Sequence, residues 1–120
     1  MAGSITLYGI PNCDTVKRAR AWLTEQGLAH QFHDFKEAGV PPDRLDAWLA
    51  GPGWQTLLNR QGTTWRKLDA ATQAAVVDAA SARALLIAHS SLIKRPVADW
   101  PDDSSTVGFD SLQVKARQGC

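Results

Sequence analysis

The chain has 120 residues, of which 44% are hydrophobic and 21% are charged, and its formal net charge is +1 at pH 7. This length suits one domain with its own hydrophobic core, and the composition is that of an ordinary globular protein. A net charge so close to zero gives no overall attraction to nucleic acid or to an anionic membrane surface. We therefore expect neither as a partner.

Cysteine content and the first residues indicate a cellular compartment. The two cysteines, Cys13 and Cys120, are too few for a disulfide framework and suit a reducing environment. Residues 1–12 lack the basic and apolar segments of a secretory signal. The alanine-rich region 70–93 is interrupted by charged side chains, so we do not expect it to span a membrane. These features predict a cytoplasmic protein.

The first third of the chain predicts a strand, a helix and a second strand. Residues 5–10 alternate in the manner of a buried strand. A proline–asparagine pair ends this strand, and Asn12 is a favoured N-cap for a helix that starts at Cys13. Gly27 is placed to end the helix, and residues 30–35 alternate again. Because a helix connects the two strands, we expect them to be parallel.

The middle of the chain is expected to be helical, without a strand. Residues 36–42 are interpreted as a turn-rich connector and residues 60–68 as a loop. Four helical segments are predicted there: 42–49, 54–58, from 69 or 72 to about 80, and 81–89. Asp69 or Thr72 is the expected cap of the third segment.

The last third returns to extended structure. Residues 92–97 predict a strand, and a turn over 101–105 leads to a hairpin partner at 106–108. Residues 111–117 predict a short final helix. This element order favours an α/β fold: a thioredoxin-like, four-stranded mixed sheet with an inserted helical subdomain.

We expect a single domain over residues 1–120. Its sheet core would come from residues 1–36 and 92–117, and the helical insertion would span 37–91.

Cys13 stands where a strand meets the start of a helix. The first turn of a helix presents unpaired N–H groups and the positive end of the macrodipole. Lys17 follows one turn later and adds a positive charge. These features favour the thiolate, which is the nucleophilic form of cysteine. Residues 13–16 read Cys-Asp-Thr-Val, so no second cysteine forms a C-x-x-C pair. A reactive Cys13 therefore needs a thiol from another molecule.

Three blocks of sequence resemble one known family. Residues 7–15 read Leu-Tyr-Gly-Ile-Pro-Asn-Cys-Asp-Thr, residues 62–68 read Gly-Thr-Thr-Trp-Arg-Lys-Leu, and residues 93–96 read Ile-Lys-Arg-Pro. Together, in this order, they closely resemble the arsenate-reductase-like family, which includes ArsC and Spx proteins. Within it, the chain is most similar to the YffB-like branch of small glutathione-dependent thiol reductases. The resemblance covers residues 4–115.

This resemblance implies a thioredoxin-like fold with a helical insertion and a catalytic cysteine, which would be Cys13. It also implies that Arg95 contributes to an anion site and that Pro96 is the cis-proline facing the cysteine. A cis bond before proline is physically accessible and recurs at functional turns. Glutathione is the implied co-substrate.

The chain departs from arsenate reductases at three positions. Those enzymes resemble one another in three arginines around the oxyanion, and only Arg95 matches here. Asn59 stands where the first is expected, and residues 108–110 hold no arginine. Val16 replaces a hydroxyl residue. Because a polyanion needs several donors, we expect arsenate reduction to be weak at most.

Several other residues have more than one interpretation. Arg66 and Arg60 are candidates for assisting Arg95 with the glutathione carboxylates. Asn12 and Thr15 are interpreted first as helix caps that also shape the cysteine loop. The residues whose expected role is structural are His33, the five tryptophans and the terminal Cys120.

The sequence thus predicts a cytosolic monothiol thiol–disulfide oxidoreductase that uses glutathione, with no metal or nucleotide cofactor. Its partners would be glutathione and a disulfide-containing substrate, and we expect a monomer. The alternatives are a non-enzymatic adaptor that binds another protein, as Spx binds RNA polymerase, and a weak arsenate reductase. The physiological substrate is left open by the sequence.

Overall fold

The computed structural model describes residues 4–118. The chain divides into two compact units, which are described separately below. The sheet unit comprises Met1–Gly39 and Arg95–Cys120, and the helical unit comprises Val40–Lys94. The expectation that both units form one domain stays a prediction.

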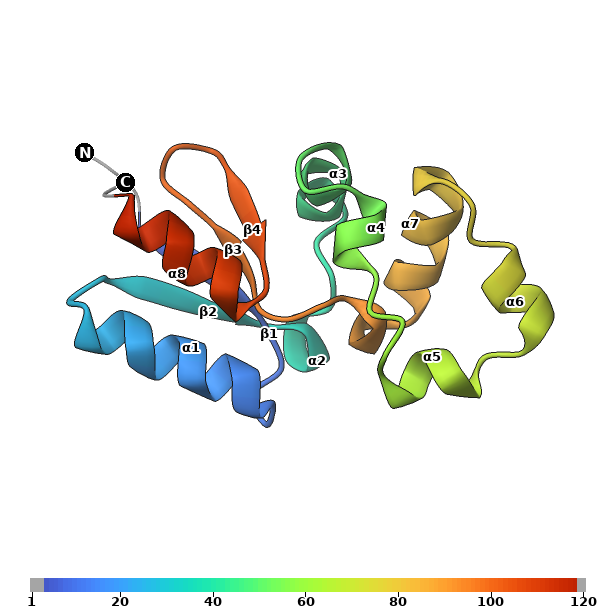
Figure 1. The fold of residues 1–120 in the computed structure, drawn as a ribbon, viewed down its shortest axis with the longest axis horizontal. Helices are drawn as coiled ribbons and strands as arrows, with labels where there is room; N and C mark the ends of the chain where they lie inside the picture. Colours follow the sequence, from blue (N-terminus) through green and yellow to red (C-terminus); the bar gives the residue numbers. More distant parts are fainter. Residues whose placement is uncertain (1–3, 119–120) are drawn as a thin grey trace. The chain divides into compact units, whose positions relative to one another are not determined.

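A four-stranded mixed sheet forms the centre of the sheet unit (Figure 1). Its strands are β1 (Ile5–Gly9), β2 (His30–Asp34), β3 (Val97–Asp99) and β4 (Ser105–Val107). The order across the sheet is β2-β1-β3-β4. β1 and β2 are parallel, whereas β1–β3 and β3–β4 are antiparallel. This arrangement confirms the predicted thioredoxin-like sheet, the parallel pair and the C-terminal hairpin.

Two helices, α1 (Asp14–Glu25) and α8 (Phe109–Arg117), share the main core of this unit with the sheet. Ile5 and Leu7 alternate along β1 and point into that core, as the period of two requires. Ala19 and Leu23 occupy one face of α1 and meet them there. The helix therefore lies against the sheet with its N-terminus directly after β1, and this places Cys13 at the corner.

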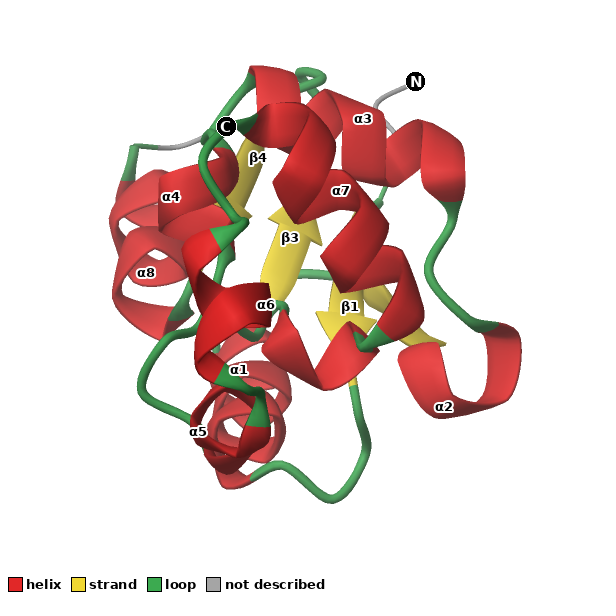
Figure 2. Ribbon diagram, turned by 90° about the vertical axis from the view of Figure 1, so that its right-hand side faces the viewer, coloured by secondary structure: helices red, strands yellow, loops and turns green. Residues whose placement is uncertain are grey.

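The helical unit contains helices, loops and one 3₁₀ turn (Figure 2). Its elements are α3 (Pro42–Ala50), α4 (Trp54–Leu57), α5 (Thr63–Lys67), α6 (Ala70–Ala74), α7 (Ala79–Ala88) and η1 (Ser90–Leu92). The side chains of Trp48 and Leu86 are fully buried in this unit. An ion pair of 2.6 Å between Arg83 Nε and Asp46 Oδ1 joins α7 to α3. Throughout residues 4–118, no helix is both long and apolar enough to cross a bilayer.

Two short helices replace predicted irregular segments. The predicted connector over 36–42 begins with helix α2 (Phe35–Ala38), because Asp34 Oδ1 accepts a hydrogen bond from Lys36 N at 2.8 Å and caps it. The predicted loop over 60–68 contains α5. Thr64 Oγ1 is hydrogen-bonded to Ser91 Oγ at 2.8 Å, a partner 27 positions away that local sequence does not reveal.

The predicted helix from 69 or 72 to about 80 is wrong in its second half. Asp69 caps α6, with its Oδ1 accepting from Thr72 N at 3.0 Å. α6 ends at Ala74, and a new helix, α7, begins after Asp78. Asp78 Oδ1 accepts from Ser81 N at 2.9 Å, and Ser81 Oγ accepts from Asp78 N at 3.1 Å. This reciprocal capping box starts a separate helix.

The segment 92–97 is also less regular than predicted. Leu92 belongs to η1, Ile93 makes an isolated antiparallel bridge to Leu58, and only Val97 is in a strand. The final helix α8 begins at Phe109, two residues before the predicted start. Its cap is Gly108, whose φ of +92° suits glycine far better than other residues.

Candidate functional site

Cys13 is itself the N-cap of α1, so the prediction that Asn12 caps the helix is wrong. Cys13 has extended backbone angles (φ −96°, ψ 123°) and makes no side-chain capping hydrogen bond. Its N–H donates to Ile10 O at 3.4 Å, and its carbonyl accepts from Lys17 N at 3.0 Å. Asn12 is exposed in the preceding turn. Cys13, a half-buried residue, therefore immediately precedes the first turn of α1.

The pairing of β1 with β3 aligns the Arg95–Pro96 segment with the chain that leads to Cys13. Tyr8 pairs with Val97 in antiparallel register, so one more step along the ladder sets Gly9 opposite Pro96. The Arg95–Pro96 peptide bond is cis, as the resemblance implied. Gly108 N donates to Pro96 O at 2.8 Å and ties this segment to the start of α8.

The first turn of α1 packs closely on β1 through the contact of Val16 with Gly9. Val16 is fully buried, and a Cβ added to Gly9 would lie 2.7 Å from its Cγ2. Only a glycine at position 9 lets the first turn of α1 approach β1 this closely. Where arsenate reductases carry a hydroxyl, this chain has a methyl group that fills the space above Gly9. Thr15, next to it, is half-buried and Lys17 is exposed.

Arg60 lies in the helical unit, close to two indole rings. Its guanidinium carbon is 5.6 Å from the ring centroid of Trp54 and 5.8 Å from that of Trp65. Both distances allow cation–π attraction, which orients the guanidinium. The N–H groups of a guanidinium lie in its own plane, so contacts with the ring faces leave edges that suit a carboxylate. The sequence predicts only a packing role for these tryptophans, and nothing local in it indicates that they share a contact with Arg60.

The other basic candidate of the helical unit is Arg66, in the last turn of α5 and exposed. Asn59, which stands where arsenate reductases carry an arginine, serves the local backbone. Its N–H donates to Leu92 O at 2.8 Å, and its Oδ1 accepts from Gln61 N at 3.0 Å.

His33 contacts backbone and aromatic rings. Its Nε2 donates to Gly39 O at 2.8 Å. Its ring centroid lies 5.1 Å from that of Tyr8 and 5.9 Å from that of Phe35. The hydrogen bond thus ties β2 to Gly39, the residue that caps the end of α2. Cys120, the other residue interpreted as structural, lies outside the described residues.

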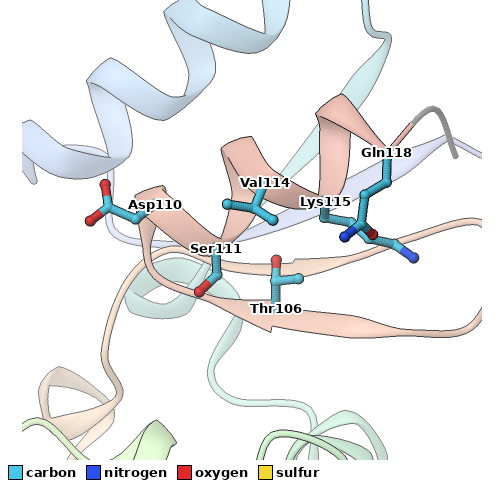
Figure 3. A pocket seen from close by; sticks show the side chains of 6 residues that line it. All are labelled: Thr106, Asp110, Ser111, Val114, Lys115 and Gln118. Carbon is cyan, nitrogen blue, oxygen red and sulfur yellow. The ribbon is translucent and has the colours of Figure 1, made fainter.

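A surface hollow of about 340 Å³ lies between β4 and α8 (Figure 3). It is lined by Thr106, Asp110, Ser111, Val114, Lys115 and Gln118. None of the predicted site residues is among them. Lys115 Nζ pairs with Asp102 Oδ2 at 2.5 Å, so the one basic residue of this hollow is already neutralised. We assign it no role in the chemistry.

The part of the chain that the structure describes contains no cluster of side chains suited to bind a metal ion. Among residues 4–118, no group of three or more histidine, cysteine, aspartate or glutamate side chains could hold an ion. The candidate chemistry is that of the thiol.

These features define a thioredoxin-like protein with a single cysteine at the strand–helix corner and a cis-proline directly before the neighbouring strand β3. The model of the ArsC family matches residues 8–117, and the chain belongs to that family.

Three similar proteins cover most of this chain. The chain is 47% identical to the solved structure of YffB protein, with a TM-score of 0.85 over 94% of this chain and 97% of the other. It is 37% identical to an uncharacterized protein of Haemophilus influenzae, over 93% of this chain and 96% of the relative. It is also 24% identical to the global transcriptional regulator Spx of Streptococcus pyogenes, over 93% and 83%. The proteins similar to this chain thus include YffB protein and a global transcriptional regulator.

Proposed function

We propose that the protein is a cytoplasmic, monothiol thiol–disulfide oxidoreductase that takes its electrons from glutathione. The observation that carries the proposal is the position of Cys13 as N-cap of the twelve-residue helix α1 in a chain of the ArsC family. The N–H groups of the first turn stabilise negative charge on an approaching sulfur. A thiol at this place is suited to act as a nucleophile.

The reaction consists of three thiol–disulfide exchanges. The Cys13 thiolate attacks one sulfur of a substrate disulfide, a mixed disulfide forms at Cys13, and the other substrate sulfur leaves as a thiolate that takes up a proton. A glutathione thiolate then attacks the Cys13 sulfur and releases the second substrate thiol. A second glutathione restores Cys13 and leaves as oxidised glutathione. In sum, one disulfide is reduced to two thiols and two glutathione molecules are oxidised to one disulfide.

The remaining candidate residues bind glutathione or shape the cysteine loop. Arg95 is proposed to hold a glutathione carboxylate, because a guanidinium binds a carboxylate through two parallel hydrogen bonds. Arg66 and Arg60 assist it, and the two indoles beside Arg60 orient its guanidinium. The residues proposed to support the loop or the thiolate are Asn12, Thr15, Lys17 and Pro96. We infer a monomer, without metal or nucleotide.

The test is glutathione-dependent turnover of a small disulfide by the wild type, Cys13→Ser and Cys120→Ser. Cys13→Ser should abolish turnover and Cys120→Ser should retain it, because Cys13 is the only thiol of the protein that takes part in the proposed exchange. Arg95→Ala should chiefly raise the KM for glutathione and leave kcat nearly unchanged. Unchanged turnover in Cys13→Ser would contradict an exchange mechanism through Cys13.

A second candidate function is that of an adaptor that binds another protein without catalysis. The similarity to the regulator Spx favours it. An adaptor should keep its partner in Cys13→Ser and should show no turnover in the wild type. Weak arsenate reduction is a third candidate, and arsenate-dependent consumption of glutathione would reveal it. The buried methyl groups of Val16 speak against efficient reduction, since they offer no hydroxyl to an oxyanion.

A further inference from the structure

We propose that the face of α1 that begins at Cys13 binds acidic side chains of the substrate, so that the preferred substrates are polypeptide disulfides with acidic residues close to the reacting cysteine. This inference rests on the proposed function and deepens it by naming a substrate class. It concerns the helix surface beyond the thiol, which the exchange reaction itself does not use.

Cys13, Lys17, Arg20 and Thr24 share one face of α1, because their spacing of four, three and four residues follows the 3.6-residue turn. Lys17 stands directly one turn above Cys13, as the hydrogen bond from Lys17 N to Cys13 O shows. The buried residues Val16, Ala19 and Leu23 occupy the face toward the sheet. Lys17, Arg20 and Thr24 are exposed.

This face borders an open hollow of about 660 Å³. The hollow is lined by Lys17, Arg20, Ala21, Thr24, Glu25 and His30. Its two cations are the lining residues nearest in sequence to Cys13, and its one carboxylate, Glu25, ends the helix. With a rise of about 1.5 Å per residue, Lys17 and Arg20 lie roughly 6 and 10 Å along the axis from Cys13. The end of the hollow toward the thiol is therefore positively charged.

Arg20 is held in place by a neighbouring strand. Its guanidinium carbon lies 4.6 Å from the ring centroid of Phe32 on β2, which is a cation–π contact. His30 is oriented as well, with Nδ1 donating to Leu28 O at 3.3 Å. An arginine that is already oriented loses less conformational freedom when a carboxylate binds. The hollow thus carries a preorganised cation rather than a freely moving one.

The distances of Lys17 and Arg20 from Cys13 indicate where the substrate should carry its acidic residues. An extended chain advances about 3.3 Å per residue, so side chains two and three residues from a reacting cysteine reach about 7 to 10 Å from its sulfur. Successive side chains of an extended chain point to opposite sides, so a carboxylate at whichever of these positions faces α1 would meet Lys17 or Arg20 while the substrate sulfur faces Cys13. Neutral or basic side chains there would gain nothing from these cations.

The same helix offers a matched control. Arg18 is also exposed and also contacts a phenylalanine, with its guanidinium carbon 5.4 Å from the ring centroid of Phe109. It does not line the hollow. Arg18→Gln and Arg20→Gln therefore remove the same charge and a similar ring contact, but only Arg20→Gln changes the proposed docking face.

The test uses two disulfide-linked peptides that differ only in having Glu or Gln at the second and third positions after the cysteine. Binding to the Cys13→Ser protein is measured by fluorescence anisotropy, in which no exchange interferes. We expect the Glu peptide to bind about fivefold more tightly than the Gln peptide, with the ratio falling about threefold in Cys13→Ser/Arg20→Gln and unchanged in Cys13→Ser/Arg18→Gln. Raising the salt concentration to 0.5 M should remove the preference, because the charges are screened.

Equal binding of the two peptides, or equal effects of the two arginine variants, would overturn the docking proposal. Turnover of the Gln peptide by the wild-type protein tests the exchange reaction separately. Turnover without a Glu preference in binding would contradict only the docking face. A Glu preference without any turnover would contradict only the oxidoreductase function.

Discussion

The candidate residues of the two units are held in place in different ways. In the sheet unit, the strand register and the helix start fix the backbone at Cys13 and Pro96. In the helical unit, ring contacts with Trp54 and Trp65 orient Arg60 at the surface. Backbone placement depends on the packing of the whole unit, whereas ring contacts depend on two or three side chains. Changes near Cys13 should therefore cost stability and reactivity together, and changes at Arg60 should be mild.

The largest losses of stability are expected from truncating one buried leucine in each unit. Leu23→Ala in the sheet unit and Leu86→Ala in the helical unit each remove a fully buried side chain and should each lower the free energy of unfolding by about 3 kcal/mol. Urea unfolding is followed by far-ultraviolet circular dichroism and by tryptophan fluorescence. If the chain is one domain, both variants shift one common transition. Two transitions, each moved by one variant only, would contradict the single-domain prediction.

Gly9→Ala should have the next largest effect on stability, because its new Cβ would lie 2.7 Å from Val16 Cγ2. Val16 is fully buried and β-branched, so it has little freedom to turn away. We expect a loss of about 2 kcal/mol and slower reaction of Cys13 with a thiol reagent, measured by urea unfolding and by alkylation rate.

The double variant Gly9→Ala/Val16→Ala is the control for this clash. If contact between the two side chains is the cause, the second substitution costs less in the Gly9→Ala background than alone, and the effects are not additive. Strict additivity would assign the loss at Gly9 to some other cause.

Arg60→Gln should have a smaller effect on stability. Losing two exposed ring contacts is expected to cost about 1 kcal/mol, and the fluorescence spectrum of the protein should shift, since two of its five tryptophans lose a cation. Arg66→Gln is the matched control, because Arg66 is exposed one residue after Trp65 and no cation–π contact is found for it among the described residues. Equal changes in the two variants would contradict the role of the rings.

The smallest effect is a pH dependence at Asp102. A hydrogen bond from Lys115, with help from Ser104, lowers the pKa of Asp102 from its usual 3.8. A lowered pKa in the folded state means that the carboxylate stabilises the fold above pH 3.8 and that this contribution is lost as the pH falls through the folded-state value. Asp102→Asn should therefore be slightly less stable than wild type at pH 7, with a gap that narrows toward pH 2. A gap independent of pH would contradict the ion pair with Lys115.

Sequence alone predicted the features that local patterns determine. The alternation over 5–10 and the helical spacing after Cys13 determined the strand–helix corner, and a turn-rich stretch determined the hairpin of β3 and β4. The cis bond before Pro96 came from family resemblance and is present. In each case the signal lies within a few consecutive residues or in a recognised motif.

Part of what the sequence did not predict depends on partners that are distant along the chain. α5 is held by a hydrogen bond between the hydroxyls of Thr64 and Ser91, and no local cap indicates this helix. The contact of Phe32 with Arg20 links a strand to the preceding helix, so the hollow on α1 required the fold to be known. Two missed features could have been found from the sequence by a closer look at capping residues: α2, with its cap by Asp34, and the start of α7, with its capping box between Asp78 and Ser81.

The reactivity of Cys13 toward glutathione is tested by the intact mass of the protein after incubation with oxidised glutathione at neutral pH. Wild type, Cys13→Ser and Cys120→Ser are compared, with peptide mapping of any adduct. A glutathione-linked monothiol reductase predicts rapid addition of one glutathione at Cys13 in the wild type and in Cys120→Ser, and none at position 13 in Cys13→Ser. No adduct, or an adduct at Cys120 alone, would contradict a catalytic role of Cys13 and favour the adaptor function.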